Sequence, residues 1–299
     1  MKIIEIETFL MIVKTGSISA SARKMFATQS TVSYRIKLLE EELGFKLLVR
    51  SKGHKNIELT NKGKDFLAIA NQWMSLWKDT KNIKNKQDIY NITIGSVDSI
   101  NNHSFVSHYL DLIDLKKINL DIRTYHSNEI YSLLENYNID IGYVFSKVQN
   151  KNILTKHLYS EKMYLICHND SPYYDKIKLS ELKRINEIFL SWGPDYNQWH
   201  DQLWDSNEDL YIKINTGSML SNYLENNKNS WAIAPYSVIK SLQNNGEFTY
   251  YETLPNPPKH SCYELMHKYP KGSQLDAIKL FTSSLDKYLN TCNWLERNF

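Results

Sequence analysis

Apolar side chains recur at helical spacing in three short segments at the start of the chain. The first segment stops at Gly16, where glycine can take the left-handed conformation that ends a helix. Ser17 can cap a short second helix, and Thr28 or Gln29 opens a third one that ends at Gly44. The pattern therefore predicts three helices, whose apolar faces carry Ile6, Phe9, Leu10 and Val13, then Ile18, Ala22 and Met25, and finally Val32, Ile36, Leu39 and Leu43.

The stretch 46–60 has the composition of two short strands around a turn at 52–56. Two short helices joined by a tight turn, followed by such a hairpin, form a winged helix-turn-helix. We therefore expect a DNA-binding type of domain over residues 1–60.

A longer apolar stripe follows and predicts one helix over about residues 61–86, capped by Thr60. Such a helix spans about 40 Å, which is too long for a small winged domain to cover alone. The stripe is either ordinary core or a seam with a partner chain, and its members are Phe66, Ile69, Trp73, Leu76 and Ile83.

From Tyr90 onward, short strand-like runs alternate with helical segments, which is typical of α/β domains. Strands are expected at 92–97, 120–125, 139–145, 163–167, 188–192, 211–214, 231–235 and 261–267, and helices at 105–115, 129–137, 219–225 and 275–289. The predicted fold class is thus multi-domain, with a helical winged N-terminus, a long connecting helix and an α/β region.

Composition supports several folded units and adds an expectation about location. The chain has 299 residues, of which 42% are hydrophobic, enough for more than one core. Charged residues interrupt the first eleven positions, and no apolar run approaches the roughly 18 residues of a membrane span. We therefore expect a cytoplasmic protein with no membrane partner, in which Cys167, Cys262 and Cys292 are isolated buried thiols.

Charge is distributed unevenly along the chain. Residues 1–64 carry 12 Lys and Arg against 6 Glu, whereas the remainder has a net charge of −3. Such asymmetry indicates that the first segment meets a polyanion and the rest does not.

The polar face of the predicted third helix has the chemistry for reading bases. Gln can bond adenine through its amide, Arg can bond guanine at two atoms, and lysines meet phosphates. The alternative is a face that is merely solvated. The candidate DNA contacts on the helix are Thr28, Gln29, Ser30, Ser33, Tyr34, Arg35 and Lys37, and those on or beside the wing are Arg50, Lys52 and Lys55.

Ordered residues across this segment resemble the N-terminal signature of LysR-type transcriptional regulators. The matching positions are Phe9, Val13, Gly16 to Ser19, Ala22, Thr28 to Ser33, Ile36, Leu39, Glu40, Leu43, Gly44, Leu47, Leu48, Arg50, Leu59, Thr60 and Gly63. The family often has proline at position 30, a second alanine at 21 and phenylalanine at 48, and these departures remove no donor for DNA.

The resemblance implies a partner chain and a domain plan. In this family the linker helix pairs with that of a second subunit, so a homodimer or homotetramer on double-stranded DNA is expected, with Phe66, Ile69, Trp73 and Leu76 in the seam. The α/β region resembles the family's effector domain, a periplasmic-binding-protein-like fold of two subdomains with crossings expected near 156–159 and 265–268. The implied boundaries are 1–60, 61–88 and 89–299, with subdomain I at about 89–158 and 266–299 and subdomain II at about 159–265.

A small-molecule effector is expected in the cleft between these subdomains, because ligands of open α/β sheets lie beyond the carboxyl ends of strands. Asp98 is a candidate for a cationic group, and Thr216 and Ser218 for a carboxylate, which points to an amino-acid-like or other small polar effector. Helix capping is the alternative role for each polar residue. The candidate effector residues are Asp98, Ser99, Ile100, Asn101, Ser127, Asn128, Tyr143, Trp192, Thr216, Gly217 and Ser218.

Three rival classes are weaker. An enzyme would need a phosphate, zinc or nucleophile signature such as GxGxxG, HExxH or GxSxG, and the sequence contains none, so neither a cofactor nor a metal site is expected. A solute-binding protein for transport would need a signal peptide. A DNA-binding protein without a ligand would lack a cleft that can bind a small molecule.

An aromatic cluster of Trp192, Tyr196, Trp199 and Trp204 either lines the cleft or fills the core beside it.

Overall fold

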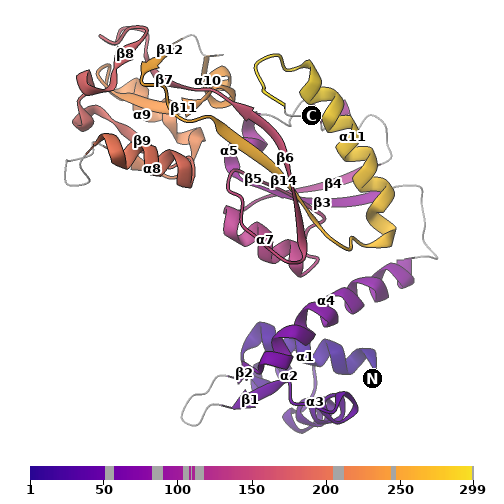
Figure 1. The fold of residues 1–299 in the computed structure, drawn as a ribbon. Helices are drawn as coiled ribbons and strands as arrows, with labels where there is room; N and C mark the ends of the chain where they lie inside the picture. Colours follow the sequence, from indigo (N-terminus) through magenta and orange to yellow (C-terminus); the bar gives the residue numbers. More distant parts are fainter. Residues whose placement is uncertain are drawn as a thin grey trace. The chain divides into compact units, whose positions relative to one another are not determined.

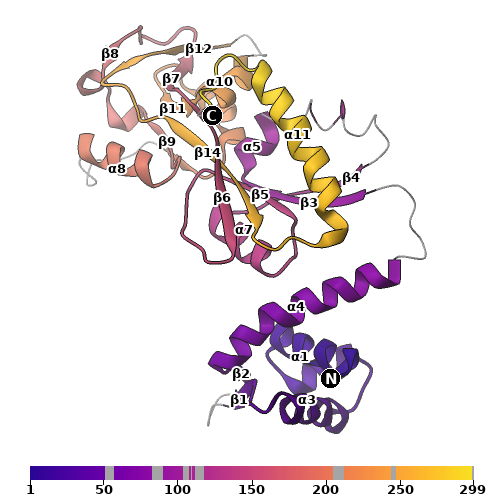
Figure 2. The ribbon, with the colours of Figure 1, turned by 45° about the vertical axis from the view of Figure 1, so that its right-hand side comes forward.

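The computed structural model describes residues 1–50, 57–82, 90–103, 108, 110–111, 118–204, 212–243 and 247–297. The chain divides into two compact units, which we call the winged unit, with residues 1–87, and the α/β unit, with residues 88–134 and 138–299. Figures 1 and 2 show their elements from two directions.

Three helices form the core of the winged unit, as the periodicity predicts. They are α1 (Ile3–Thr15), α2 (Ile18–Lys24) and α3 (Gln29–Leu43). Gly16 and Gly44 end α1 and α3 with φ of 66° and 75°, which suits glycine. The hydroxyls of Ser17 and Thr28 accept the backbone N–H of Ala20 and Thr31 and thereby cap α2 and α3.

A small hairpin and a long helix complete this unit. Strands β1 (Leu48–Arg50) and β2 (Ile57–Leu59) pair antiparallel, and the turn expected between them lies outside the described residues. Helix α4 (Asn61–Asn82) begins where Thr60 Oγ1 accepts the N–H of Gly63 at 2.8 Å. The rest of the expected helix, including Ile83, falls outside the described residues.

A five-stranded sheet organises the first half of the α/β unit, which we call half I. Its order is β4-β3-β5-β14-β6, with β3 parallel to β4 and β5, and β14 antiparallel to β5 and β6. The strands are β3 (Tyr90–Ser96), β4 (Ile118–Thr124), β5 (Ile141–Val144), β6 (Ile153–Glu161) and β14 (His260–His267). Helix α11 (Leu275–Thr291) shares a core with one face of this sheet, and α7 (Ser127–Glu135) shares a core with the other.

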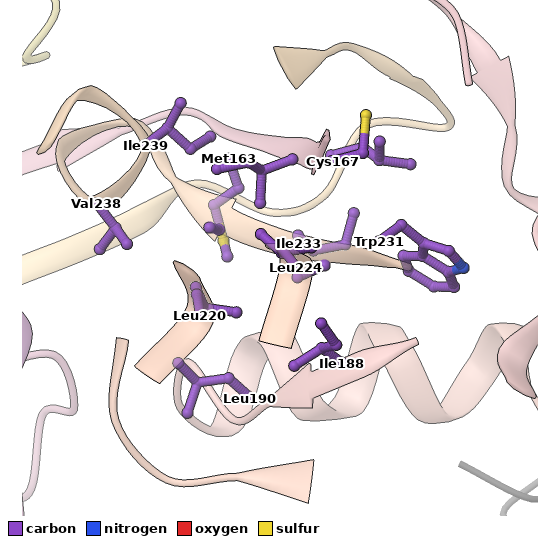
Figure 3. Packing of buried hydrophobic residues seen from close by; sticks show 14 of the residues in the cluster. Met163, Cys167, Ile188, Leu190, Leu220, Leu224, Trp231, Ile233, Val238 and Ile239 are labelled. Atoms are coloured by element: carbon purple, nitrogen blue, oxygen red, sulfur yellow. The ribbon is translucent and has the colours of Figure 1, made fainter. Parts of the chain in front are cut away.

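The second half, half II, is built around the sheet β11-β7-β12. Strands β9 and β10 form a separate two-stranded sheet, and so do β8 and β13. The strands of half II are β7 (Met163–His168), β8 (Ile177–Lys178), β9 (Ile188–Leu190), β10 (Ile212–Ile214), β11 (Trp231–Pro235), β12 (Phe248–Tyr251) and β13 (Thr253–Leu254). Helices α8 (Pro194–Leu203), α9 (Leu220–Asn226) and α10 (Tyr236–Leu242) pack on them. Figure 3 shows the resulting core, in which Ile188 and Leu190 of β9 lie near Leu220 and Leu224 of α9, with Ile233 of β11.

The chain passes between the two halves at Lys162 and again just before His260. Strand β6 pairs with β14 as far as Glu161, and Met163 already pairs with Pro235 in half II. The second crossing was expected near 265–268, which is too late, because Tyr263 to Met266 already pair with β5 of half I. The misplacement arises because the residue pattern of a strand such as β14 predicts an extended segment but does not say which sheet the strand joins.

Other differences concern short elements. The polar residues after β3 form a helical turn, α5 (Asp98–His103), where only a strand-end loop was expected. Most of the helix expected at 105–115 lies outside the described residues. Strand β6 contains the crossing segment expected near 156–159. Strands β8, β12 and β13 and helices α8 and α10 were not predicted, because short amphipathic segments give weak periodic signals.

Candidate DNA interface and cleft

Helix α3 has one face in the core of the winged unit and one face in solvent. Val32 and Leu39 are fully buried, and Ile36 is 7% exposed. The side chains predicted to meet DNA lie on the remaining surface. Thr28, Gln29, Ser30, Tyr34 and Lys37 are exposed, and Ser33 and Arg35 are half-buried. The fold therefore presents a continuous polar surface from the start of α3.

The remaining predicted DNA contacts belong to the wing. Arg50 is the last residue of β1, whereas Lys52 and Lys55 lie outside the described residues. One exposed residue was missed by sequence reasoning. Phe26, in the turn between α2 and α3, is 98% exposed and has φ of 50°, an uncommon conformation for a bulky residue. A single large apolar residue between two helices carries no periodic signal that would have indicated its exposure.

The apolar stripe of α4 is exposed except at its first member. Phe66 is 5% exposed and its ring centroid lies 5.3 Å from that of Phe9, so it belongs to the core of the winged unit rather than to an outer seam. Ile69, Trp73 and Leu76 are 53%, 44% and 51% exposed. With Gln72, Trp77 and Thr80 they line a groove along α4.

A cleft of about 690 Å³ lies in the α/β unit. The ends of five strands form it: the residues directly after β3, β4 and β5 of half I and after β9 and β10 of half II. These are carboxyl ends, where ligands of open α/β sheets bind, and the volume suits a small molecule. The lining residues are Val97 to Ser99, Thr124 to Glu129, Phe145, Ser146, Leu190 to Pro194 and Asn215 to Gly217.

Seven of the predicted effector residues line this cleft: Asp98, Ser99, Ser127, Asn128, Trp192, Thr216 and Gly217. Two glycines shape the wall around the indole. Gly217 lies so close to Trp192 that an added Cβ would meet Cη2 of the ring at 3.3 Å, and Gly193 has φ of 111°. The indole Nε1 donates to Ile233 O at 2.7 Å, which fixes the ring.

Four predicted effector residues do not line the cleft. Ile100 is fully buried in the core of half I, and Asn101 bridges Ser96 and Thr124 through its side chain. The buried Tyr143 donates its hydroxyl to Glu264 Oε2 at 3.1 Å. Ser218 lies at the rim, where its Oγ is 3.4 Å from Asp98 Oδ2. Sequence position alone does not indicate which side chains at the strand ends turn into the cleft.

Sequence reasoning also missed part of the lining. Thr124 ends β4, Tyr125 and His126 follow it, and Ser146 lies just after β5, so the same strand-end rule would have found them with sharper strand boundaries. Phe145, which the sequence placed on the strand at the floor of the cleft, also lines it. These residues add aromatic rings to the cleft, and Glu129, which was also not predicted, adds a carboxylate. The charged lining residues of the cleft are Asp98 and Glu129, and none of its described lining residues is Lys or Arg.

The aromatic cluster divides between the two roles left open by the sequence. Trp192 lines the cleft. Tyr196 is buried, which raises the pKa of its hydroxyl, and Trp199 and Trp204 pack against the same core. A buried hydrogen bond between His200 Nε2 and Glu187 Oε1, at 2.8 Å, lies beside these rings. Most of the cluster is therefore core.

Two of the three cysteines are buried as expected, whereas Cys292 is only half-buried. Burial raises the pKa of Cys167 to about 11 and raises that of Cys262 further, which keeps both as unreactive thiols at neutral pH. The described residues bring no three potential metal ligands together. Of the helices described, none is long and apolar enough to cross a membrane.

Comparison with known families identifies both parts of the chain. Residues 3–64 match the bacterial regulatory helix-turn-helix protein, lysR family. Residues 92–285, more than half of the chain, match the LysR substrate binding domain.

Individual relatives agree with this assignment. The chain is 29% identical over 201 residues to the HTH-type transcriptional regulator SoxR of an Arthrobacter species, covering 66% of each chain. The fold is shared with full-length LysG of Corynebacterium glutamicum with bound effector Arg (TM-score 0.66, 16% identity, 97% and 99% coverage). It is also shared with full-length CbnR complexed with its target DNA (TM-score 0.52, 17% identity, 96% and 99% coverage). The chain therefore belongs to the LysR family of bacterial helix-turn-helix transcription regulators.

Proposed function

We propose that this regulator binds specific promoter sequences and that a small molecule in the α/β cleft modulates this binding. The observation that carries the proposal is the cleft itself, with hydroxyl, amide and carboxylate side chains of both halves around one cavity of about 690 Å³. A ligand that contacts both halves favours the arrangement in which they close on it. The ligand shifts the equilibrium between the open and closed arrangements only as far as its affinities for the two differ.

The DNA-binding part of the proposal rests on the exposed polar surface of α3. Its amide, hydroxyl and guanidinium groups suit base edges, and Thr28 and Arg50 are assigned to the phosphate backbone. The net charge of +6 over residues 1–64 supports the same role. The solved relative CbnR is complexed with its target DNA, and we extend that activity to this chain.

A homodimer or homotetramer is the proposed assembly. Ile69, Trp73 and Leu76 expose an apolar groove on a helix of 22 residues, and a second copy of α4 would cover it. Pairing of these helices would set the separation of two winged units along the DNA. An effector that changes subunit packing would then change the spacing or bend of the bound DNA.

Polar side chains define the effector chemistry we propose for the cleft. Asp98 is assigned to a cationic group, while Ser99, Thr216 and Ser127 offer hydroxyls to a polar or carboxylate group. An amino-acid-like or other small polar molecule fits this set. The relative LysG was solved with bound effector Arg, which is a molecule of this kind.

A melting-temperature screen of the full chain against several hundred common metabolites tests the proposal, because a ligand selective for the folded state raises stability by mass action. We expect a ligand whose effect is lost on Ser99→Ala with Thr216→Ala and kept on Thr282→Ala, which removes a hydroxyl of α11 that does not line the cleft. Absence of any such ligand would favour the alternative of a ligand-independent DNA-binding protein. A cleft ligand without any specific DNA binding would favour a solute-binding protein with no regulatory role.

A further inference from the structure

A second cavity, of about 190 Å³, lies beside the cleft. The two cavities share Phe145, Ser146 and the segment Trp192 to Pro194, so a molecule bound at these residues can reach both. The second cavity is also lined by His260, the residue at which the chain returns from half II to half I. His260 was not among the effector residues predicted from the carboxyl ends of the strands.

His260 is buried in the wall of the second cavity and packs against two aromatic rings. Its side chain is buried, at 4% exposure, and its ring centroid lies 3.7 Å from that of Phe145 and 5.5 Å from that of Trp192. Both of these aromatic residues line the shared part of the cavities. A ligand in the shared part would therefore lie beside the imidazole.

Neither ring nitrogen of His260 has a hydrogen-bond partner among the described residues. The nearest carboxylate is Glu161, whose Oε1 lies 3.7 Å from Nδ1, too far for a hydrogen bond. Both oxygens of Glu161 are already engaged by Ser237, at 2.7 Å from its backbone N and 3.0 Å from its Oγ. A buried polar group left without a partner costs about 1–3 kcal/mol, so a ligand that supplies one gains affinity.

The charges around this cavity favour a neutral polar group. Lys147, Lys259 and Asp195 line it, and Lys259 is paired with Glu296, so neither sign of charge dominates. A neutral imidazole presents one donor and one acceptor, and a hydroxyl can serve either. The cleft on the other side has Asp98 and Glu129 as its charged lining residues, which suits a cation.

We propose that His260 is a specificity-determining residue that binds a hydroxyl group of the effector, and that the effector is a small organic cation with that hydroxyl at its far end. The inference rests on the proposed effector site. It narrows the ligand class from small polar molecules to hydroxyl-bearing amines. The aromatic rings of Phe145 and Trp192 would contact the apolar part between the two groups.

Two matched pairs of probes test this assignment: tyramine against phenethylamine, and 6-amino-1-hexanol against hexylamine. Each pair differs only by the hydroxyl. We expect calorimetry on the full chain to show the hydroxyl-bearing member binding roughly three- to tenfold more tightly in at least one pair. His260→Phe, which keeps a ring between Phe145 and Trp192, should abolish the difference, and His260→Gln should retain part of it. His168→Phe, outside both cavities, should leave it unchanged.

Equal affinities within both pairs, or a difference that survives in both His260 variants, would overturn the proposal. So would the absence of binding by all four probes. These failures are separable from failure of the effector site itself, because Asp98→Asn should weaken every amine that binds in the cleft. The effector site fails only when the metabolite screen also yields no ligand that depends on Ser99 and Thr216.

Discussion

The carboxylate of Glu40 holds the backbone of Leu47, accepting its N–H through Oε1 at 2.9 Å. The same oxygen accepts the N–H of Leu48 at 3.2 Å, and Oε2 accepts Lys46 Nζ at 2.7 Å. The ion pair raises the pKa of Lys46. Because Glu40 lies in the last turn of α3 and Leu48 begins β1, this buried carboxylate fixes the wing relative to the proposed recognition helix.

Glu40→Ala should destabilise the winged unit by about 2–3 kcal/mol, because it leaves two backbone N–H groups near the core without their charged acceptor. The exposed neighbour Glu41, whose ion pair with Lys37 spans 3.5 Å, is the matched control, and Glu41→Ala should stay within about 0.5 kcal/mol of the parent. Hydrogen–deuterium exchange of residues 36–50 in the full chain measures the effect. Equal protection in the two variants would show that Glu40 does not fix the wing.

The proposed division of DNA contacts predicts two kinds of mutant. Gln29→Ala and Arg35→Ala should each cost about 1–3 kcal/mol on the preferred sequence and relax base preference at one position. Arg50→Ala should weaken binding to all sequences alike and reduce the slope of affinity against salt concentration by about one. Titrations of preferred and scrambled duplexes at several salt concentrations separate the two patterns. Identical losses on both duplexes for all three variants would refute the assignments.

The exposed stripe of α4 predicts how self-association responds to charge. Leu76→Glu places a carboxylate in the proposed apolar seam and should shift the protein toward monomers by tenfold or more in dissociation constant, since burying an unpaired charge is strongly unfavourable. Lys64→Glu changes an exposed residue on another face of the same helix and should leave assembly unchanged. Sedimentation velocity over a concentration series measures both. Unchanged assembly of the Leu76 variant would place the interface elsewhere.

The buried carboxyl of Glu264 predicts a pH-dependent contribution to stability. Burial is the largest cause that raises its pKa, against the opposing effect of Lys156 and the Tyr143 hydroxyl. At neutral pH the ionised group therefore costs stability, and the cost falls as pH drops through the raised pKa and the folded state takes up a proton. Glu264→Gln should raise the melting temperature at pH 7, by about 2–4 °C for each kcal/mol gained.

The difference in melting temperature between the Glu264 variant and the parent should shrink as pH falls. Tyr143→Phe serves as a control, because it removes the hydroxyl that donates to the carboxylate. This variant should lower the melting temperature at neutral pH, whereas Glu264→Gln should raise it. A constant difference at every pH would contradict the raised pKa.

Sequence patterns located the helices of the winged unit almost to the residue, because three independent signals coincide there. The 3.6-residue period, the Ser17 and Thr28 caps, and the left-handed Gly16 and Gly44 all mark the same boundaries. The stripe of α4 was also correct in period, but periodicity could not show that Phe66 turns toward Phe9. Burial depends on the neighbouring helix, which a local pattern does not describe.

The cleft was only partly predictable for a similar reason. Rules about strand ends placed Asp98, Ser127 and Thr216 at one cavity although they are far apart in sequence. The same rules could not separate Ser99, which lines the cleft, from Ile100, which fills the core one residue later. His260 was missed because it begins the strand that returns to half I, and the expected crossing lay five residues or more beyond it.

A DNase I footprint on a bound genomic fragment, with and without the ligand found by the metabolite screen, tests most directly whether the cleft controls DNA binding. We predict that the ligand changes the length or pattern of protection by the parent protein. It should have no effect on the variant with Ser99→Ala and Thr216→Ala, which should still bind the fragment. A ligand that saturates the cleft while leaving the footprint unchanged would contradict the account.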